Sequence, residues 1–156
     1  MRKLPTVFAS LLALVAVPLL AAGTPDFSGK WSFNPAISTN VGMMSVMQMN
    51  LEIAQTPTSL AIKETTSFQG QPGGREIRYD LGGKTVVNEG AMGGKAETVA
   101  RWDGERLVVV WTSEGAVAGT QVTRTETRWL SADRRTMSVQ TVRGENKPVV
   151  MVFERK

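Results

Sequence analysis

The sequence predicts an all-β protein, most simply an antiparallel up-and-down β-barrel of about ten strands. Beyond residue 23, no long stretch shows the 3.6-residue period of an amphipathic helix. Short runs rich in β-branched residues are instead separated by glycine-rich turns, which is typical of an antiparallel meander. A meander of about ten strands is near the size at which an open sheet curls or splits. Short hairpins without a long crossover favour a closed barrel, which has no exposed edges, over the competing β-sandwich.

Five strands are predicted in the first half of the chain. The alternation of apolar and polar side chains from Met47 to Ile53 is the period of two expected for a strand with one buried face. Residues 70–74 are predicted to form a loop, because they hold three glycines and a proline. Gly82 and Gly83 are predicted to form a two-residue hairpin turn, since glycine has no Cβ to clash at positive φ. The predicted strands cover residues 27–33, 47–53, 60–68, 76–81 and 84–89.

Five further strands are predicted in the second half. The Asp103-Gly104 pair is a strong hairpin signal between two of them. Residues 107–110 are apolar at every position, which predicts a strand buried on both faces. The five strands cover residues 97–102, 106–112, 122–130, 136–142 and 149–154.

Residues 34–46 join the first two strands and interrupt this pattern. Asn34 followed by Pro35 is typical of a helix start, with an N-cap and a proline at the first helical position. Met43 and Met44 lie four and three residues before Met47, which is helical spacing. We expect a short helix or ordered loop here, and in a barrel it would lie over one mouth.

The first 23 residues have the three parts of a secretory signal peptide. Two basic residues precede an almost wholly apolar run at residues 4–20, and three small residues follow it. The apolar run is short for a membrane span, although a retained N-terminal anchor is the alternative. We therefore expect export to the periplasm or the cell exterior, cleavage after Ala22 or Gly23, and one domain at residues 24–156.

The composition excludes several kinds of binding and catalytic site. The chain has no cysteine and no histidine, which removes disulfides, the usual ligands of zinc, copper and haem, and catalytic triads built on histidine. Loss of the signal lowers the formal charge from +4 to +2, and the basic residues are interleaved with acidic ones, so no nucleic-acid surface is expected. An enzyme would need a pair of inward carboxylates or arginine chemistry, and no spacing suggests one. Neither an enzyme nor a cofactor or metal site is predicted.

Two segments carry a resemblance to a known family. The sequence Asp-Phe-Ser-Gly-Lys-Trp at residues 26–31 resembles the Gly-x-Trp opening of the lipocalin and fatty-acid-binding-protein superfamily. Residues 149–156 are similar to the last strand of intracellular fatty-acid-binding proteins, and residues 24–156 resemble small secreted lipocalin-like proteins of bacteria. The resemblance implies a barrel with a ligand cavity, in which Trp31, two residues after Gly29, plugs one end.

Two features depart from the fatty-acid-binding proteins. Their last strand carries an Arg-x-Tyr pair that holds the ligand carboxylate, and Met151 and Phe153 stand at those places here. Their two helices between the first strands are reduced to the thirteen residues 34–46. The resemblance therefore supports the fold more strongly than it supports a fatty acid as the ligand.

The methionines near the first predicted helix are an unusual cluster. Methionine is flexible and polarisable, and it suits adaptable apolar surfaces. The cluster fits a ligand-facing portal, ordinary core filling or a copper(I) site, because thioethers are soft ligands. Its members are Met43, Met44, Met47 and Met49.

Arg124, Glu126 and Arg128 alternate with threonines in the strand at residues 122–130. Inward charges would anchor an anionic ligand, whereas inward threonines would leave the charges as a solvated face, and the pattern does not decide between them. Glu64 and Arg78 are weaker candidates for the same role.

The tryptophans divide into two groups. Trp31 and Trp111 are predicted to be core residues, because large aromatic side chains are mostly buried. Trp102 and Trp129 are predicted to line the cavity or to cap it.

The predicted function is an exported carrier that binds an apolar or lipid-like molecule inside the barrel. The alternative is a cell-envelope interaction or structural module with a filled barrel and no ligand. Gly29 and Trp31 are predicted to be structural. The predicted ligand-binding residues are Met43, Met44, Met47, Met49, Trp102, Arg124, Arg128, Trp129, Met151 and Phe153.

Overall fold

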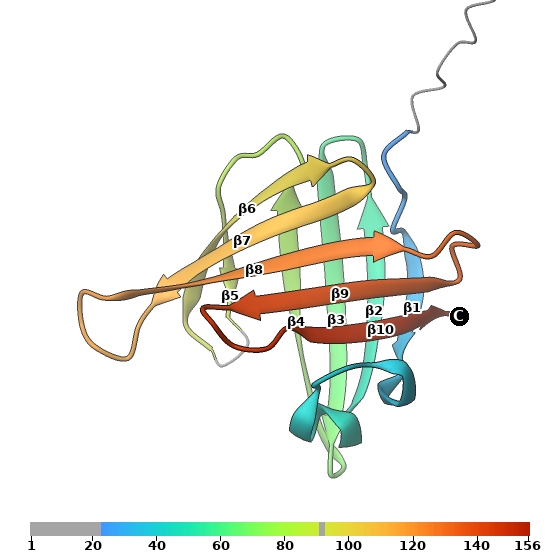
Figure 1. Cartoon of the computed structure of the whole chain (residues 1–156), viewed down its shortest axis with the longest axis horizontal. Coiled ribbons are helices and arrows are strands. Elements are labelled where there is room, and N and C mark those ends of the chain that lie inside the picture. Colours follow the sequence, from blue (N-terminus) through green and yellow to red (C-terminus); the bar gives the residue numbers. More distant parts are fainter. Residues whose placement is uncertain (1–22, 91–92) are drawn as a thin grey trace, which may run out of the picture.

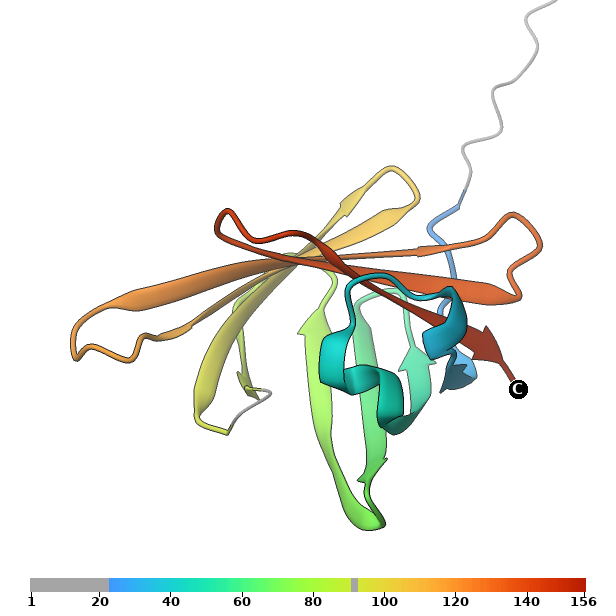
Figure 2. The same cartoon turned by 60° about the horizontal axis from the view of Figure 1, so that its bottom comes forward.

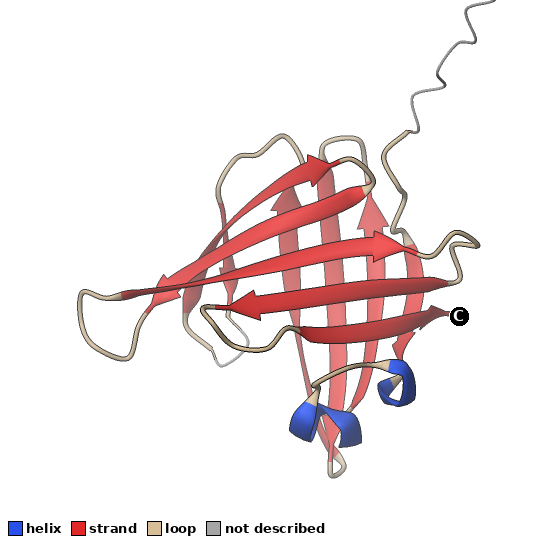
Figure 3. Ribbon diagram, in the orientation of Figure 1, coloured by secondary structure: helices blue, strands red, loops and turns tan. Residues whose placement is uncertain are grey.

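The computed structural model describes residues 23–90 and 93–156, and the predicted signal peptide lies outside the described residues except for Gly23. The described chain forms ten strands, with two short 3-10 helices between the first two (Figures 1 and 3). None of its helices is long and apolar enough to cross a membrane. The elements are β1 Gly29–Phe33, η1 Pro35–Ile37, η2 Gly42–Val46, β2 Gln48–Gln55, β3 Ser59–Phe68, β4 Gln71–Asp80, β5 Val86–Glu89, β6 Lys95–Asp103, β7 Arg106–Glu114, β8 Gln121–Leu130, β9 Thr136–Arg143 and β10 Val149–Arg155.

All ten strands belong to one antiparallel sheet in the order β4-β3-β2-β1-β10-β9-β8-β7-β6-β5. The short strand β1 lies between β2 and β10 and pairs with both, so the first and last strands of the chain are neighbours in the sheet. Figures 1 and 2 show β2, β3 and β4 running across β7, β8 and β9 at a steep angle, so that the sheet folds over itself. The predicted antiparallel barrel of about ten strands is therefore confirmed.

One end of the barrel is plugged by aromatic side chains. Trp31 is fully buried, and its Nε1 donates a hydrogen bond of 2.9 Å to the Phe27 carbonyl. The ring of Phe27 stacks on Trp102 at 6.0 Å. Arg155 lies over the Trp31 ring at 4.2 Å, and a Cβ on Gly29 would come within 2.6 Å of its guanidinium. Gly29 has φ +127°, a backbone conformation that L side chains rarely adopt, so the Gly-x-Trp segment favours glycine at this position.

The two 3-10 helices lie across the other end (Figure 2). The Asn34 side chain caps η1 by accepting a hydrogen bond from the Ala36 amide, and Pro35 begins the helix as predicted. Thr39 then pairs with Val150 of β10 through two backbone hydrogen bonds. The prediction of a short helix between the first two strands is confirmed, with two 3-10 turns in place of one α-helix.

The predicted loop at residues 70–74 is wrong, because β4 already begins at Gln71. The turn between β3 and β4 is shorter and uses Gln69 and Gly70, both of which have positive φ. Strand β4 is at an end of the sheet, where a proline without an N–H is tolerated. Gly74 is also needed here, since a Cβ would overlap the Glu64 carbonyl.

The predicted two-residue hairpin at Gly82-Gly83 is also wrong, because β4 and β5 are the two ends of the sheet and share no ladder in the described chain. The Asp80 carboxylate accepts hydrogen bonds from the amides of Gly82 at 3.0 Å and Lys84 at 3.1 Å. The chain wraps around this carboxylate in a wider turn, so β5 begins only at Val86.

The predicted burial of residues 107–110 on both faces is wrong as well. Leu107 and Val109 are fully buried, whereas Val108 and Val110 are only half-buried. A single sheet closed on itself has one inner face, so its outward side chains meet solvent.

Replacing Gly83 by Val is expected to lower the free energy of unfolding by about 1–3 kcal/mol, because a β-branched residue is strained at positive φ. Gly83 has φ +88°, so this position still favours glycine in the wider turn. Urea denaturation would measure the loss, with Lys84→Val as the control in the same exposed turn. Equal stability of the two variants would contradict the expected strain.

Candidate functional site

The charged side chains of β8 point into the barrel. Glu126 and Arg128 are buried, and Arg124 is half-buried, whereas the alternating Thr123 is exposed. The sequence left the direction of this strand open, and the structure places the charges inside. A row of charges in a barrel interior requires compensating partners.

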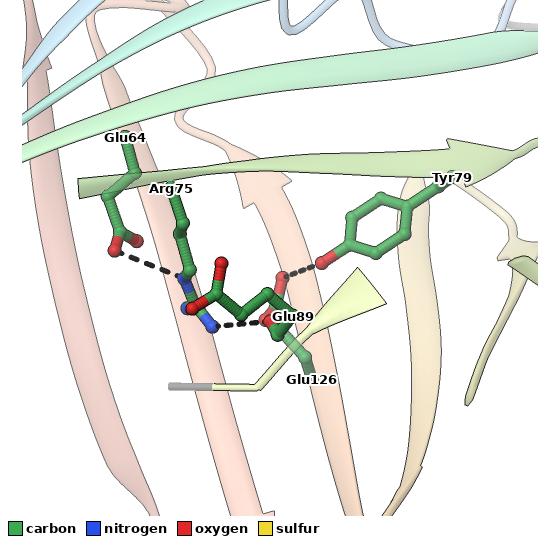
Figure 4. A network of polar contacts seen from close by, with 5 residues as sticks. All are labelled: Glu64, Arg75, Tyr79, Glu89 and Glu126. Atoms are coloured by element: carbon green, nitrogen blue, oxygen red, sulfur yellow. Dashed lines mark hydrogen bonds and ion pairs between the residues drawn. The ribbon is translucent and has the colours of Figure 1, made fainter. Parts of the chain in front are cut away.

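Two ion pairs supply part of this compensation. Arg128 Nη2 lies 2.7 Å from Glu126 Oε1, and Arg75 Nε lies 3.2 Å from Glu64 Oε1. Arg75 also donates through Nη1 to the Glu89 carbonyl at 3.2 Å (Figure 4). The Arg75 contacts therefore link β3, β4 and β5, and the Arg128–Glu126 pair lies within β8.

Tyr79 joins the same network. Burial, followed by the neighbouring Glu126 carboxylate, raises the pKa of the Tyr79 hydroxyl well above its ordinary value. The hydroxyl is therefore neutral and can donate to Glu126 at 3.5 Å (Figure 4).

Arg124 stacks on an aromatic face at the inner wall. Its guanidinium lies 4.2 Å from the centroid of Trp111, and Arg75 lies 5.7 Å from the same ring. Burial lowers the pKa of the Arg124 guanidinium, which nevertheless stays charged near neutral pH. Arg124 belongs to none of the three ion pairs that the described residues form. It is a partly desolvated cation available to a bound anion.

A cavity of about 410 Å³ lies between this network and the 3-10 helices. One part of its wall is apolar and comes from the cap, β2 and β10, and the other part is the polar network. The methionines on its wall are Met44, Met47, Met49 and Met151. The charged residues on its wall are Glu64, Arg75, Glu89, Arg124 and Glu126.

A second pocket of about 500 Å³ adjoins this cavity and shares Arg124 and Gly90 with it. Trp111 lines the second pocket together with two further cations, Lys95 and Arg143. Arg124 therefore lies where the two spaces meet.

Five residues predicted to bind ligand lie elsewhere. Met43 is on the outer surface, 78% exposed, whereas its neighbour Met44 packs against the core. Trp129 points outward under the guanidinium of Arg106, since Arg128 beside it points inward. The other three do not line the cavity: Arg128 is buried in its ion pair, Phe153 is buried against Phe33, and Trp102 is half-buried at the plugged end.

Sequence reasoning missed two residues of the interior polar contacts, Arg75 and Asn88. Arg75 follows the stretch that was predicted as a loop, although it shares the parity of Ile77 and Tyr79, and this alternation could have placed it inside. Of the weaker candidates, Glu64 is inside and Arg78 is exposed. Asn88 gave no signal, because its role depends on the distant strand β4.

The arrangement is better suited to binding than to acid–base chemistry. Glu64 and Glu126 are inward carboxylates, but each is already neutralised by an arginine. Within residues 23–90 and 93–156, no group of three or more acidic side chains is placed to hold a metal ion. The cavity combines an apolar methionine wall with Arg124, which lies outside the ion pairs of the described residues, and this combination can hold an amphipathic anion.

Comparisons with known proteins give one clear result. No family model and no curated protein sequence matches this chain. Solved structures do match: a mutant of the fluorescent protein UnaG has a TM-score of 0.66 at 19% identity, covering 83% of this chain and 95% of that one. The chain has the fold of these barrels. At such identity the likeness concerns the fold, and the predicted structural resemblance to fatty-acid-binding proteins is confirmed at that level.

Two further matches have names that state a function. The REP1-NXSQ fatty acid transporter has a TM-score of 0.61 at 18% identity, over 83% of this chain and 95% of that one. The apo form of Caenorhabditis elegans lipid binding protein 8 has a TM-score of 0.61 at 11% identity, with the same two coverages. The fold is thus one that carries lipids in other proteins, and these two are named for binding or transport rather than for a reaction.

Proposed function

We propose that the protein is an exported carrier of a small, mainly apolar molecule that bears one acidic group. The observation that carries this proposal is the position of Arg124, a cation outside every ion pair of the described chain, on the wall of a methionine-lined cavity. The apolar part of the ligand contacts Met44, Met47, Met49 and Met151, and the acidic group contacts Arg124.

Burial of apolar surface supplies most of the affinity in this proposal. Each 100 Å² of apolar surface removed from water contributes roughly 2.5 kcal/mol. Flexible methionine side chains adapt to ligands of different shape. The hydrogen-bonded contact with Arg124 then selects acids over neutral molecules of the same shape.

Export rests on the predicted signal peptide at residues 1–23. Fractionation of the native host, followed by intact-mass measurement, would test it. Recovery outside the cytoplasm, with a mass that begins after Ala22 or Gly23, supports export. A full-length chain in the cytoplasm would refute it.

Arg124→Gln is expected to weaken binding of anilinonaphthalene sulfonate by about 10-fold or more, because a charge-assisted hydrogen bond is lost. Binding of the neutral N-phenylnaphthylamine, which has the same rings without the sulfonate, should be unchanged. Fluorescence titration would measure both dissociation constants.

Arg106→Gln is the matched control, since Arg106 stacks on Trp129 at 4.9 Å outside the barrel. It should leave both titrations at wild-type values. If Arg124→Gln did not weaken binding of the sulfonate probe more than binding of the neutral probe, the acidic group would not contact Arg124. If the wild type bound neither probe, the carrier function itself would be refuted.

An interaction module is the second candidate, and one surface favours it. Ile37, Met43 and Val46 expose apolar side chains on the 3-10 helices, with 52%, 78% and 69% of their surface accessible. Met43→Asp should abolish partner capture if this surface is the working one. Met44→Asp should instead weaken probe binding, because Met44 lines the cavity.

A further inference from the structure

The seam between β4 and β5 is held by a side chain in place of a strand ladder. Asn88 Oδ1 accepts a hydrogen bond from the Arg78 amide at 2.8 Å, and Asn88 Nδ2 donates to the Arg78 carbonyl at 2.8 Å. The Asn88 carboxamide thereby takes the place that a peptide group of a neighbouring strand would fill. Asn88 Nδ2 also donates to Thr98 Oγ1, which itself donates to the Val86 carbonyl, so the carboxamide is held in position.

The seam between β4 and β5 also borders the cavity, at residues other than Asn88 and Arg78. The cavity wall includes Gly74 and Arg75 from β4 and Glu89 and Gly90 from the other side of the seam. Two of these four residues are glycines, which have no side chain to fill the space between the strands. Among the described hydrogen bonds, the one that crosses this part of the seam is from Arg75 to the Glu89 carbonyl, at 3.2 Å.

Residues 34–40, which form the first part of the segment across the capped end, are fastened more firmly than the seam. Five hydrogen bonds join the cap to β10 and the residue before it: the Asn34 amide to the Val152 carbonyl, two between Thr39 and Val150, the Val152 amide to Ser38 Oγ, and Asn40 Nδ2 to the Pro148 carbonyl. Four of them involve β10 backbone groups, and their loss would expose a sheet edge. Among the described residues, the three hydrogen bonds across the seam all involve a side chain, so parting β4 from β5 breaks no ladder there.

We propose that molecules enter and leave the cavity through the β4–β5 seam, with the Asn88 carboxamide as the latch that closes it. The inference rests on the proposed carrier function and adds the route and its control. It differs from the simplest expectation for a capped barrel, in which exchange occurs past the 3-10 helices. Opening requires only that side-chain hydrogen bonds exchange with water, which is a local motion.

Covalent closure of the seam tests the route directly. Arg78 and Val87 are both exposed on the outside and flank the latch, because Arg78 is bonded by Asn88 and Val87 precedes it. The chain has no cysteine, so Arg78→Cys together with Val87→Cys gives a unique pair for a short bismaleimide. The control is the same double variant treated with N-ethylmaleimide, which modifies both sites without joining them.

Stopped-flow fluorescence with anilinonaphthalene sulfonate should show association and dissociation rates that both fall at least about 10-fold in the cross-linked protein. The dissociation constant should stay unchanged, because the cavity is unaltered, and the control should exchange at the wild-type rate. Wild-type exchange in the cross-linked protein would overturn the proposal and place the route at the cap.

Asn88→Ala gives the opposite test. Loss of two latch hydrogen bonds should raise both rates by about 10-fold at an unchanged dissociation constant. Unchanged rates in a folded Asn88→Ala protein would show that Asn88 is not the latch. If this variant fails to fold, the cross-linked protein still decides the route. Failure of the carrier function is distinguishable, since the unmodified wild type would then bind neither probe.

Discussion

Replacing Arg128 by Ala is expected to lower the free energy of unfolding by about 3–5 kcal/mol, because the change leaves the Glu126 carboxylate buried without its counter-ion. The Arg128 side chain is 4% exposed and that of Glu126 is 12% exposed, with 2.7 Å between their charged atoms. Chemical denaturation followed by tryptophan fluorescence would measure the loss.

The matched control removes both charges. A double variant with Glu126→Leu and Arg128→Met replaces the ion pair by apolar side chains of similar length, and it should recover most of the lost stability. The Arg75–Glu64 pair remains intact in this variant, whereas the Tyr79 hydroxyl loses Glu126 as its acceptor, which limits the recovery. A single variant as stable as the wild type would contradict the burial of the pair.

Trp31→Ala is expected to cost about 3–5 kcal/mol of stability, because a large aromatic side chain leaves a cavity in a packed core. Trp31 is fully buried, its Nε1 hydrogen bond to the Phe27 carbonyl is lost, and Arg155 loses the ring on which it stacks. The cost should therefore lie near the upper end of the range. Thermal and urea unfolding would both report it.

Trp129→Ala is the control for this prediction, since it removes the same side chain from the outer face. Its cost should be about 1 kcal/mol or less, from the loss of one exposed cation–π contact with Arg106. Equal losses for the two tryptophan variants would show that Trp31 does not plug the barrel.

The fold was predictable where the local pattern is strong. Strand β2 contains all of the predicted alternation except Met47, which caps the C-terminal end of η2, and the Asp103-Gly104 signal lies at the turn between β6 and β7, as predicted. Predictions failed around β4 and β5, since Gly73 and Gly74 look like loop residues but suit a strand with one free edge. A local window cannot show which strand lies at an edge, because this depends on the whole sheet.

The candidate site was predictable in part. The methionines and Arg124 were singled out from the sequence, and Met44, Met47, Met49, Met151 and Arg124 do meet at one cavity. Arg75 and Glu64 complete the network from two other strands. Their pairing with each other, and the contact of Tyr79 with Glu126 across the interior, are long-range events without a sequence signal.

By itself the sequence determined the class of fold, since the period of two and the glycine turns are local properties of the chain. It also excluded thiol and imidazole chemistry, because neither residue type is present. Only the tertiary structure decided which face of β8 points inward. A one-residue change of register reverses every side chain of a strand, and in this strand apolar residues occur on both faces. The latch at Asn88 was decided in the same way, because its two partners on Arg78 face it only when the barrel has closed.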